Sequence, residues 1–333
     1  DAPAGPKGLS LFLVPKILPG GKRNAVVCER IEEKMGLHGS PTCVMRFDDA
    51  TGWLVGEPNK GLNAMFVMMN AARLHVGLQG IGLLEAAWQK ASAYAAERRQ
   101  MRAPGAKDTS LIQDHPAIRR ILHTQRAWID GGRVLAYHTA LQLDVAKHST
   151  DAGERAAAQR WCALVTPVLK AALTDQAFHG ASACLQVFGG HGYVREWGIE
   201  QIVRDARVAM IYEGTNEIQA IDLLVRKVLA DGGQGLGALL GSLPGAAPSA
   251  AASARRHALV EITQTLAIAA QSDPELPYWV ADDYLRAVAL VLLEWAWAQI
   301  GAVSHGERWS APAQALAQWV LPEFDMRAAM LRQ

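Results

Sequence analysis

The sequence predicts a mainly α-helical protein, in which a few antiparallel strands are followed by a four-helix bundle and a C-terminal helical extension. Short β-rich runs are confined to residues 8–55. Apolar residues then recur at helical spacing from about 60 to 230, and a second helical stretch runs from 255 to 333. A chain of 333 residues is expected to form two or three domains. The expected parts are 1–57 with the strands, 58–231 with the bundle, a Gly/Ala/Ser/Pro-rich linker at 232–254, and the extension at 255–333.

Three strands are predicted in the N-terminal part. They are LSLFLVPK at 9–16, NAVVCERI at 24–31 and TCVMRFDDA at 42–50, separated by turn residues. Three strands are too few for an independent barrel or sandwich. We therefore expect them to form part of a larger sheet.

An apolar stripe marks the first bundle helix. The stripe consists of Leu74, Leu78, Ile81, Leu84 and Trp88, which are three or four residues apart. Gly77, Gly80 and Gly82 lie in the same run, and each costs up to about 1 kcal/mol relative to Ala. This cost predicts a close approach of another helix or of a ligand.

Caps and breakers predict the other bundle helices. The second is expected to begin with Asp114 as its cap and Pro116 in its first turn. The third covers about 152–187 and ends at the glycines that follow, and the fourth runs from about Thr215 to Leu229. Four long helices joined by turns are typical of a bundle.

Charge and composition exclude several classes of protein. With 33 Lys+Arg against 32 Asp+Glu, the chain lacks the positive field of a general nucleic-acid binder. Its hydrophobic content of 50% excludes a disordered chain. The four cysteines are far apart, which favours reduced thiols over disulfides or a metal site. The longest apolar helical stretch, 287–303, is short and contains Glu294, so a cytoplasmic protein without membrane or nucleic-acid partners is expected.

Two catalytic motifs are excluded by their missing parts. The glycines at 189, 190 and 192 are not followed by Lys-Ser/Thr and are not flanked by a βαβ unit, which excludes a phosphate-binding P-loop. No Gly-x-Ser-x-Gly nucleophile elbow is present.

Glu213 has an unusual position in the sequence. It follows the apolar run Ala209–Tyr212 and precedes Gly214 and a predicted helix start. A carboxylate beside an apolar pocket can act as a general base. Alternatively, Glu213 is a helix-initiating acid near the positive end of a helix dipole. Spacing alone leaves both interpretations open.

The segment QVFGGHGYVREWGIEQIVRDARVAMIYEGTNEIQ at 186–219 closely resembles the flavin-contacting and catalytic stretch of the acyl-CoA dehydrogenase family. The resemblance continues in KMGLHGSPTCVMRFDDA (34–50), GEPNKGLNAMFVMMNAARLHVGLQGIG (56–82) and YAAERRQM (94–101), and it covers about 8–230. It implies that 1–57 is the C-terminal part of the family's middle β-domain and 58–231 its C-terminal four-helix bundle. The extension, with HGSPTC and MMNAARLHVGLQG, resembles the branch containing methylmercaptopropionyl-CoA dehydrogenase.

The resemblance implies an FAD-dependent α,β-dehydrogenation of an acyl-CoA thioester to trans-2-enoyl-CoA. Glu213 matches the family's base for the α-proton, while the β-hydrogen leaves as hydride to flavin N5. Gly214 matches the position where backbone lies against substrate. Arg73 matches the substrate-side arginine of the first bundle helix, although a helix–helix ion pair is an equally good interpretation. Asn70 occupies a substrate-side position where other family branches carry an acid, which leaves Glu213 as the base.

The resemblance also implies a set of cofactor-binding residues. Arg suits a pyrophosphate because its fork binds two oxygens. The matching positions for FAD are Arg98, Gln100, Gln186, Val187, Phe188, Gly189, Gly190, Thr215, Asn216 and Glu217. Among these, 186–190 match the loop that contacts FAD in a neighbouring subunit, which implies a homo-oligomer, a dimer or a tetramer.

The resemblance further implies an electron-transfer flavoprotein as the partner that accepts the electrons. Family members begin with a helical domain and further strands that this chain lacks, so it is expected to be a fragment that is not an active enzyme on its own. The alternative is an inert helical oligomerisation or scaffold module of the same family.

Overall fold

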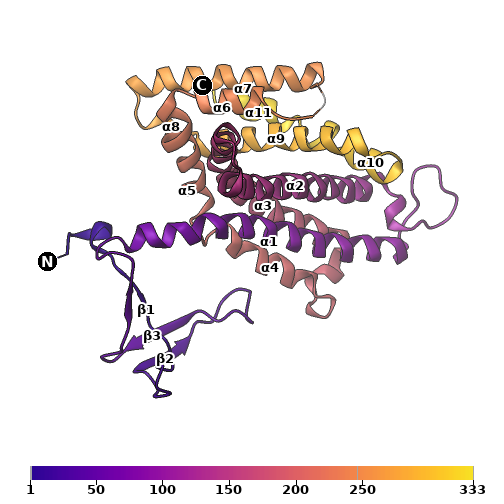
Figure 1. Ribbon diagram of the computed structural model, residues 1–333. Helices are drawn as coiled ribbons and strands as arrows, with labels where there is room; N and C mark the ends of the chain where they lie inside the picture. The colour runs from indigo at the N-terminus through magenta and orange to yellow at the C-terminus, as the bar shows by residue number, and fades with distance from the viewer. Residues whose placement is uncertain (1, 246, 333) are drawn as a thin grey trace. The chain divides into compact units, whose positions relative to one another are not determined.

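The predicted fold class is confirmed: the protein is mainly helical, with a few antiparallel strands near its N-terminus (Figure 1). A computed structural model describes residues 2–245 and 247–332, apart from the side chains of Val67 and Asn70. The chain divides into two compact units, Asp1–Ala72 and Arg73–Gln333. The helices are α1 Gly61–Glu97, α2 Pro116–His148, α3 Ala152–Val187, α4 Ile199–Ala209, α5 Asn216–Ile221, α6 Gln234–Gly241, α7 Ala250–Ser272, α8 Leu276–Trp279, α9 Ala281–Val303, α10 Glu307–Ala315 and α11 Glu323–Met330.

The N-terminal unit contains two antiparallel two-stranded ribbons. One pairs β1 with β4 and the other pairs β2 with β3. The strands are β1 Leu11–Leu13, β2 Val26–Ile31, β3 Cys43–Phe47 and β4 Trp53–Val55. The prediction found β1 to β3 and missed β4, which has only three residues. Large apolar side chains on both ribbons, including Phe12, Leu13 and Ile31, are exposed. Two-stranded ribbons of this kind are marginally stable by themselves.

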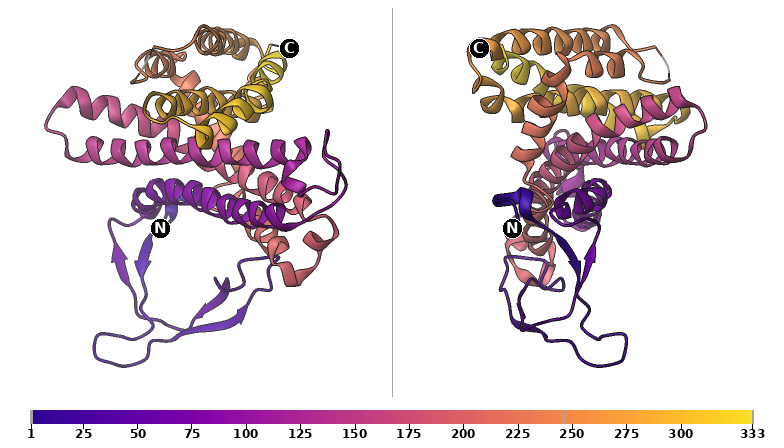
Figure 2. Two further views of the ribbon diagram at one scale, coloured as in Figure 1. Left: turned by 90° about the vertical axis from the view of Figure 1, so that its right-hand side faces the viewer. Right: turned by 60° about the vertical axis from the view of Figure 1, so that its left-hand side comes forward.

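The helices of the second unit are arranged in layers (Figures 1 and 2). The long helices α2 and α3 pack side by side, α1 and α4 lie on one side of them, and α9 lies on the other, covered in turn by α7 and α11. One continuous apolar core joins these layers. The predicted stripe of α1 is confirmed, since Leu74, Ile81 and Leu84 are buried and Leu78 and Trp88 pack against the same core or its neighbour.

Glycines allow the helices to approach closely. A Cβ atom at Gly77 would lie 3.3 Å from the Leu169 carbonyl oxygen, and one at Gly80 only 2.8 Å from the Leu173 carbonyl oxygen. The predicted close approach at these two positions is therefore that of α3. A Cβ atom at Gly82 would meet nothing within 4 Å, so that glycine has no packing role.

Helix boundaries agree with the prediction in part. The third bundle helix is found at Ala152–Val187, where the Asp151 carboxylate caps the N-terminus by accepting a 2.8 Å hydrogen bond from the Glu154 N–H. The cap of α2 was predicted wrongly: it is His115, because Asp114 lies in a short 3-10 turn. Thr215 caps α5 as predicted, but the helix continues as a π-helical segment over Asp222–Val228.

Two further segments differ from the expectations. Helix α4, a short amphipathic helix between the glycines after α3 and the Glu213 segment, was not predicted. The expected linker at 232–254 contains α6 and the start of α7, because Leu236, Leu239 and Leu240 are buried in the core. Ala246, within the same segment, lies outside the described residues.

Helix α9 is the central helix of the extension. It is the one described helix that is long and apolar enough to cross a membrane by length and composition. In this chain 61% of its most apolar window is buried, with Tyr284, Leu290 and Leu293 fully enclosed. Its apolar character is thus accounted for by packing against α2, α3 and α7.

Replacing Gly80 by Ala should destabilise the second unit. The added methyl group would press on the backbone of α3, and overpacking of this kind costs roughly 1–3 kcal/mol. Gly82→Ala is the matched control, and it should stabilise the helix by up to about 1 kcal/mol because nothing opposes the better propensity of Ala. Urea unfolding followed by circular dichroism measures both changes, and equal shifts for the two variants would contradict the packing role of Gly80.

Candidate functional site

Glu213 lies at the tip of a tight turn between α4 and α5. The turn is closed by a 3.0 Å hydrogen bond from the Asn216 N–H to the Met210 carbonyl oxygen. Both Glu213 and Gly214 adopt the left-handed backbone conformation, with φ of 56° and 87°. For Glu213 this conformation is unfavourable, and strained residues of this kind cluster at functional sites.

The side chain of Gln219 supports the turn from within. Its Nε2 donates to the carbonyl oxygens of Glu213 and Gly214, at 3.3 and 3.4 Å. A Cβ atom at position 214 would lie 2.7 Å from this Nε2, so glycine is required there by close approach as well as by φ. Gln219 is fully buried, and the sequence analysis did not single it out.

Helix α1 contacts the turn through two polar side chains. The Tyr212 hydroxyl donates a hydrogen bond to Gln79 Oε1. The Arg73 guanidinium approaches Gly214, with 3.9 Å from Nη2 to a Cβ built there, and its Nη1 lies 4.0 Å from Asp222 Oδ2. The buried Nε of Arg73 has no hydrogen-bond partner among the described residues. The ion pair of Arg73 with Asp222 is therefore long and weak. The unpaired N–H of Arg73 can still donate a hydrogen bond beside the turn.

A buried lysine lies directly behind the turn. Lys170 of α3 is 0% exposed, and its Nζ donates a 2.9 Å hydrogen bond to Asn216 Oδ1. The Thr174 hydroxyl lies 3.2 Å from the same oxygen, and Asn216 Nδ2 donates to the Ala171 carbonyl oxygen. These bonds fix the first residue of α5 against α3. The sequence analysis missed Lys170, although a single lysine inside the apolar run VTPVLKAAL was a usable signal.

Burial and hydrogen bonding shift the pKa values of two charged groups near the turn. Desolvation lowers the pKa of Lys170 to about 8, while the nearby carboxylates of Glu217 and Glu213 oppose the shift. A hydrogen bond with the Thr215 side chain lowers the pKa of the Glu217 carboxyl. Thr215 also accepts from the Ile218 N–H, so it acts as the helix cap that the sequence predicted.

A second group of predicted residues surrounds a cavity of about 220 Å³ where the ends of α1 and α3 meet. We call it the Arg98 cavity. Its lining includes six of the residues predicted to bind a cofactor. They are Arg98, Gln100, Gln186, Val187, Phe188 and Gly189. Gly190 follows directly but does not line the cavity.

Aromatic stacking gives this cavity a rigid wall. The rings of Tyr94 and Phe188 stack with their centroids 4.3 Å apart, and the Tyr94 hydroxyl lies 2.9 Å from His191 Nδ1. His191 in turn stacks on Trp197 at 4.6 Å. Arg98 is exposed at the cavity and forms no ion pair within the described part of the chain.

The two groups lie far apart in the second unit. Arg73 and Tyr94 are 21 residues apart on α1, which corresponds to about 30 Å along the helix axis. Among the described residues of this unit, the two non-glycine residues with positive φ are Glu213 and Met101, one in each group. The side chain of Asn70 lies outside the described residues. No set of three or more His, Cys, Asp or Glu residues that could hold a metal ion occurs in the described ranges.

Comparison with known proteins gives matches over most of the chain. Residues 59–228, just over half of the chain, match the family described as acyl-CoA dehydrogenase, C-terminal domain. A 3-methylmercaptopropionyl-CoA dehydrogenase from Ruegeria pomeroyi is 47% identical over 241 residues, which are 70% of this chain and 41% of that protein. The chain thus spans less than half the length of this curated relative.

Solved structures share the fold over nearly the whole chain. Caenorhabditis elegans ACDH-11 in complex with C11-CoA has a TM-score of 0.76 at 22% identity, covering 95% of this chain and 54% of that one. A Bacillus anthracis acyl-CoA dehydrogenase complexed with FAD has a TM-score of 0.73 at 21% identity, covering 92% and 56%.

Replacing Lys170 by Met should change how stability depends on pH. Between the folded pKa of about 8 and the ordinary value of 10.5, the unfolded chain binds more protons at this residue than the folded chain does. Wild-type stability should therefore rise with pH across this window, by up to roughly 3 kcal/mol from Lys170. The variant should lack this gain, as measured by urea unfolding at pH 7.5 and pH 10. The exposed Lys147→Met should behave like wild type, and the same pH dependence in all three proteins would contradict the assignment.

Proposed function

Because the chain belongs to the acyl-CoA dehydrogenase family, we propose that the protein catalyses the FAD-dependent α,β-dehydrogenation of an acyl-CoA thioester to trans-2-enoyl-CoA. The observation that carries the proposal is the strained turn that holds Glu213 beside Arg73 and above the buried Lys170–Asn216 pair. The relative named for an acyl-CoA substrate and the structure containing C11-CoA support the substrate class.

Glu213 is the proposed base for the α-proton. An α-C–H beside a thioester is a weak acid, so a carboxylate removes its proton efficiently only when water is excluded and the enolate-like charge is stabilised. Glu213 is half-buried, and its backbone position is fixed by the hydrogen bonds that Gln219 and Asn216 make within the turn. This fixed position favours proton abstraction from a bound acyl group.

The backbone N–H of Glu213 can assist the same proton abstraction. Its N–H has no hydrogen-bond partner among the described residues, whereas the N–H groups of Ile211 and Tyr212 both donate to Val208. A free N–H at this point could donate to the thioester oxygen as negative charge develops there. Gly214 and Arg73 would border the substrate, and Asn70 is proposed as a substrate residue on the resemblance alone.

The Arg98 cavity fits the phosphate-containing part of FAD. Arg98 and Gln100 offer side-chain donors, and a Cβ atom at Gly189 or Gly190 would meet nothing within 4 Å, which leaves the backbone open to a ligand. Gln186, Val187 and Phe188 complete the proposed contact. Bound FAD would supply the acceptor for the β-hydrogen, which leaves as hydride. At the Glu213 turn, the residues proposed to contact FAD are Thr215, Asn216 and Glu217.

The resemblance to the family implies a shared site. In that family the loop matching residues 186–190 contacts the FAD of a neighbouring subunit, and the separation of about 30 Å along α1 is compatible with this arrangement. Each group would then contribute to a different FAD, and a second copy of the protein would complete each site. We therefore propose a homo-oligomer, with an electron-transfer flavoprotein as the electron acceptor.

Glu213→Gln tests the proposed chemistry directly. In the intact protein with FAD bound, this variant should reduce its flavin at least about 1,000-fold more slowly after addition of an acyl-CoA, because a general base contributes up to about four orders of magnitude. Acyl-CoA binding should be largely retained, since Gln preserves the shape of Glu. The measurement is the stopped-flow loss of flavin absorbance.

Glu261→Gln is the matched control, because Glu261 is exposed on α7, outside both groups. It should reduce flavin at the wild-type rate. Near-normal flavin reduction by Glu213→Gln would remove Glu213 as the base and would favour the inert scaffold interpretation of this chain.

A further inference from the structure

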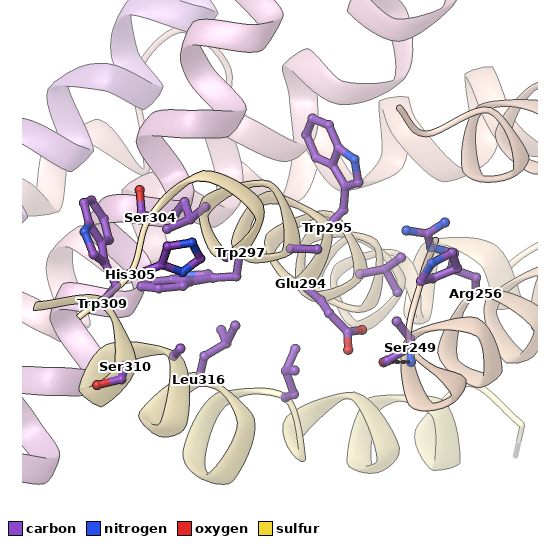
Figure 3. Close-up of a pocket in the computed structure, with 18 of the residues that line it drawn as sticks. Ser249, Arg256, Glu294, Trp295, Trp297, Ser304, His305, Trp309, Ser310 and Leu316 are labelled. Carbon is purple, nitrogen blue, oxygen red and sulfur yellow. Dashed lines mark hydrogen bonds between the residues drawn. The ribbon is translucent and has the colours of Figure 1, made fainter. Parts of the chain in front are cut away.

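The C-terminal extension contains a cavity that the proposed function does not use. It has a volume of about 460 Å³ and lies over the C-terminal half of α9, between the start of α7 and helix α10 (Figure 3). Small-molecule sites typically have volumes of about 300–1,000 Å³. None of its lining residues belongs to the Glu213 turn or the Arg98 cavity. We call it the extension cavity.

One end of the extension cavity is apolar and aromatic. Trp297 and Trp309 meet edge to face there, with ring centroids 6.5 Å apart. The Trp297 N–H is already used by the Ala127 carbonyl oxygen of α2, at 2.9 Å, so the ring is left to line the cavity. Leu316 and Leu321 add buried aliphatic surface at this end. An apolar chain placed here would be removed from water on several sides.

The other end is charged, with Arg256 and Glu294 in its lining. Glu294 lines the cavity but forms a bidentate ion pair with Arg255, including a 2.8 Å hydrogen bond from Arg255 Nε, so its charge is balanced. The neighbouring Arg256 also lines the cavity and forms no ion pair within the described residues. Its one hydrogen bond is long, 3.5 Å from Nη1 to the Leu240 carbonyl oxygen. Figure 3 shows Arg256 and Ser249 at the end of the cavity opposite Trp297 and Trp309.

A half-buried guanidinium without an anionic partner is unfavourable. Burial lowers the pKa of Arg256, which expresses the cost of keeping the cation there, while the charge of Glu294 opposes this shift. Helix α7 also begins at this end, capped by the Ser249 hydroxyl oxygen, and its dipole adds to the positive potential. A carboxylate would interact favourably with both the Arg256 guanidinium and the N-terminus of α7, since charge-assisted hydrogen bonds to Arg are among the stronger polar contacts.

We propose that the extension cavity binds a small amphipathic carboxylate, with its apolar chain against Trp297 and Trp309 and its carboxylate at Arg256. The ligand class follows from the arrangement of the two ends: the aromatic end favours an apolar chain, and Arg256, which forms no ion pair among the described residues, favours a carboxylate. The site is separate from the proposed dehydrogenation and would give the extension a binding role of its own.

Calorimetric titration of the purified chain with octanoate tests the proposal, with the neutral octan-1-ol as the matched ligand. Octanoate should bind with one-to-one stoichiometry and more tightly than octan-1-ol. Arg256→Gln should weaken octanoate binding by about tenfold or more, because it removes a charged hydrogen-bond donor, and should leave octan-1-ol binding unchanged. Arg332→Gln, a charge change at an exposed position near the C-terminus, should bind octanoate like wild type.

A second variant tests the location. Ala313 lines the aromatic end, and Ala313→Phe should fill the cavity and abolish binding of both ligands. Equal binding of octanoate and octan-1-ol, unchanged octanoate binding by Arg256→Gln, or no saturable binding at all would each overturn the proposal.

Discussion

The buried hydrogen bond between Lys170 and Asn216 is the interaction on which the arrangement of the Glu213 turn depends. It ties the first residue of α5 to the middle of α3, a helix that contributes many residues to the core. The turn before α5 then has little freedom, because Asn216 also closes it through Met210 and Gln219 holds its carbonyl oxygens. Burying an ammonium group is costly, and its retention here fits a role in positioning the turn rather than in stabilising the fold.

Helix α1 sets the distance between the Glu213 turn and the Arg98 cavity. Its glycines allow it to lie close to α3, so its length sets the separation of the two groups of candidate residues. Arg73 lies beside the Glu213 turn and Tyr94 beside the Arg98 cavity. A helix of this length separates Arg73 from Tyr94 by about 30 Å, which is compatible with the proposed sites shared between copies. The extension supplies no predicted residue to either group, but its α9 packs against α5, which follows the Glu213 turn.

Much of the fold could be predicted from the sequence, because its signals are local. The Asp151 cap and the glycines after Val187 define α3, and the spacing of Leu74 to Trp88 defines the buried face of α1. The strand β4 was missed because three residues carry too little pattern. Helix α4 was missed although its 11 residues carry an amphipathic pattern. For the site, motif resemblance singled out Glu213, Arg98 and Gln186 together. It could not find Lys170 or Gln219, since their roles arise from contacts across the bundle that no local pattern encodes.

The central claim is that each chain contributes its Glu213 turn to one FAD site and its Arg98 cavity to another. Mixing refolded Glu213→Gln and Arg98→Glu copies of the intact protein tests it, with acyl-CoA-dependent flavin reduction as the readout. Each variant alone should be inactive. The mixture should recover about a quarter of wild-type activity, since half of random pairs are mixed and each mixed pair contains one intact site. No recovery in verified mixed oligomers would contradict the account, because it would place both groups at one site within one chain.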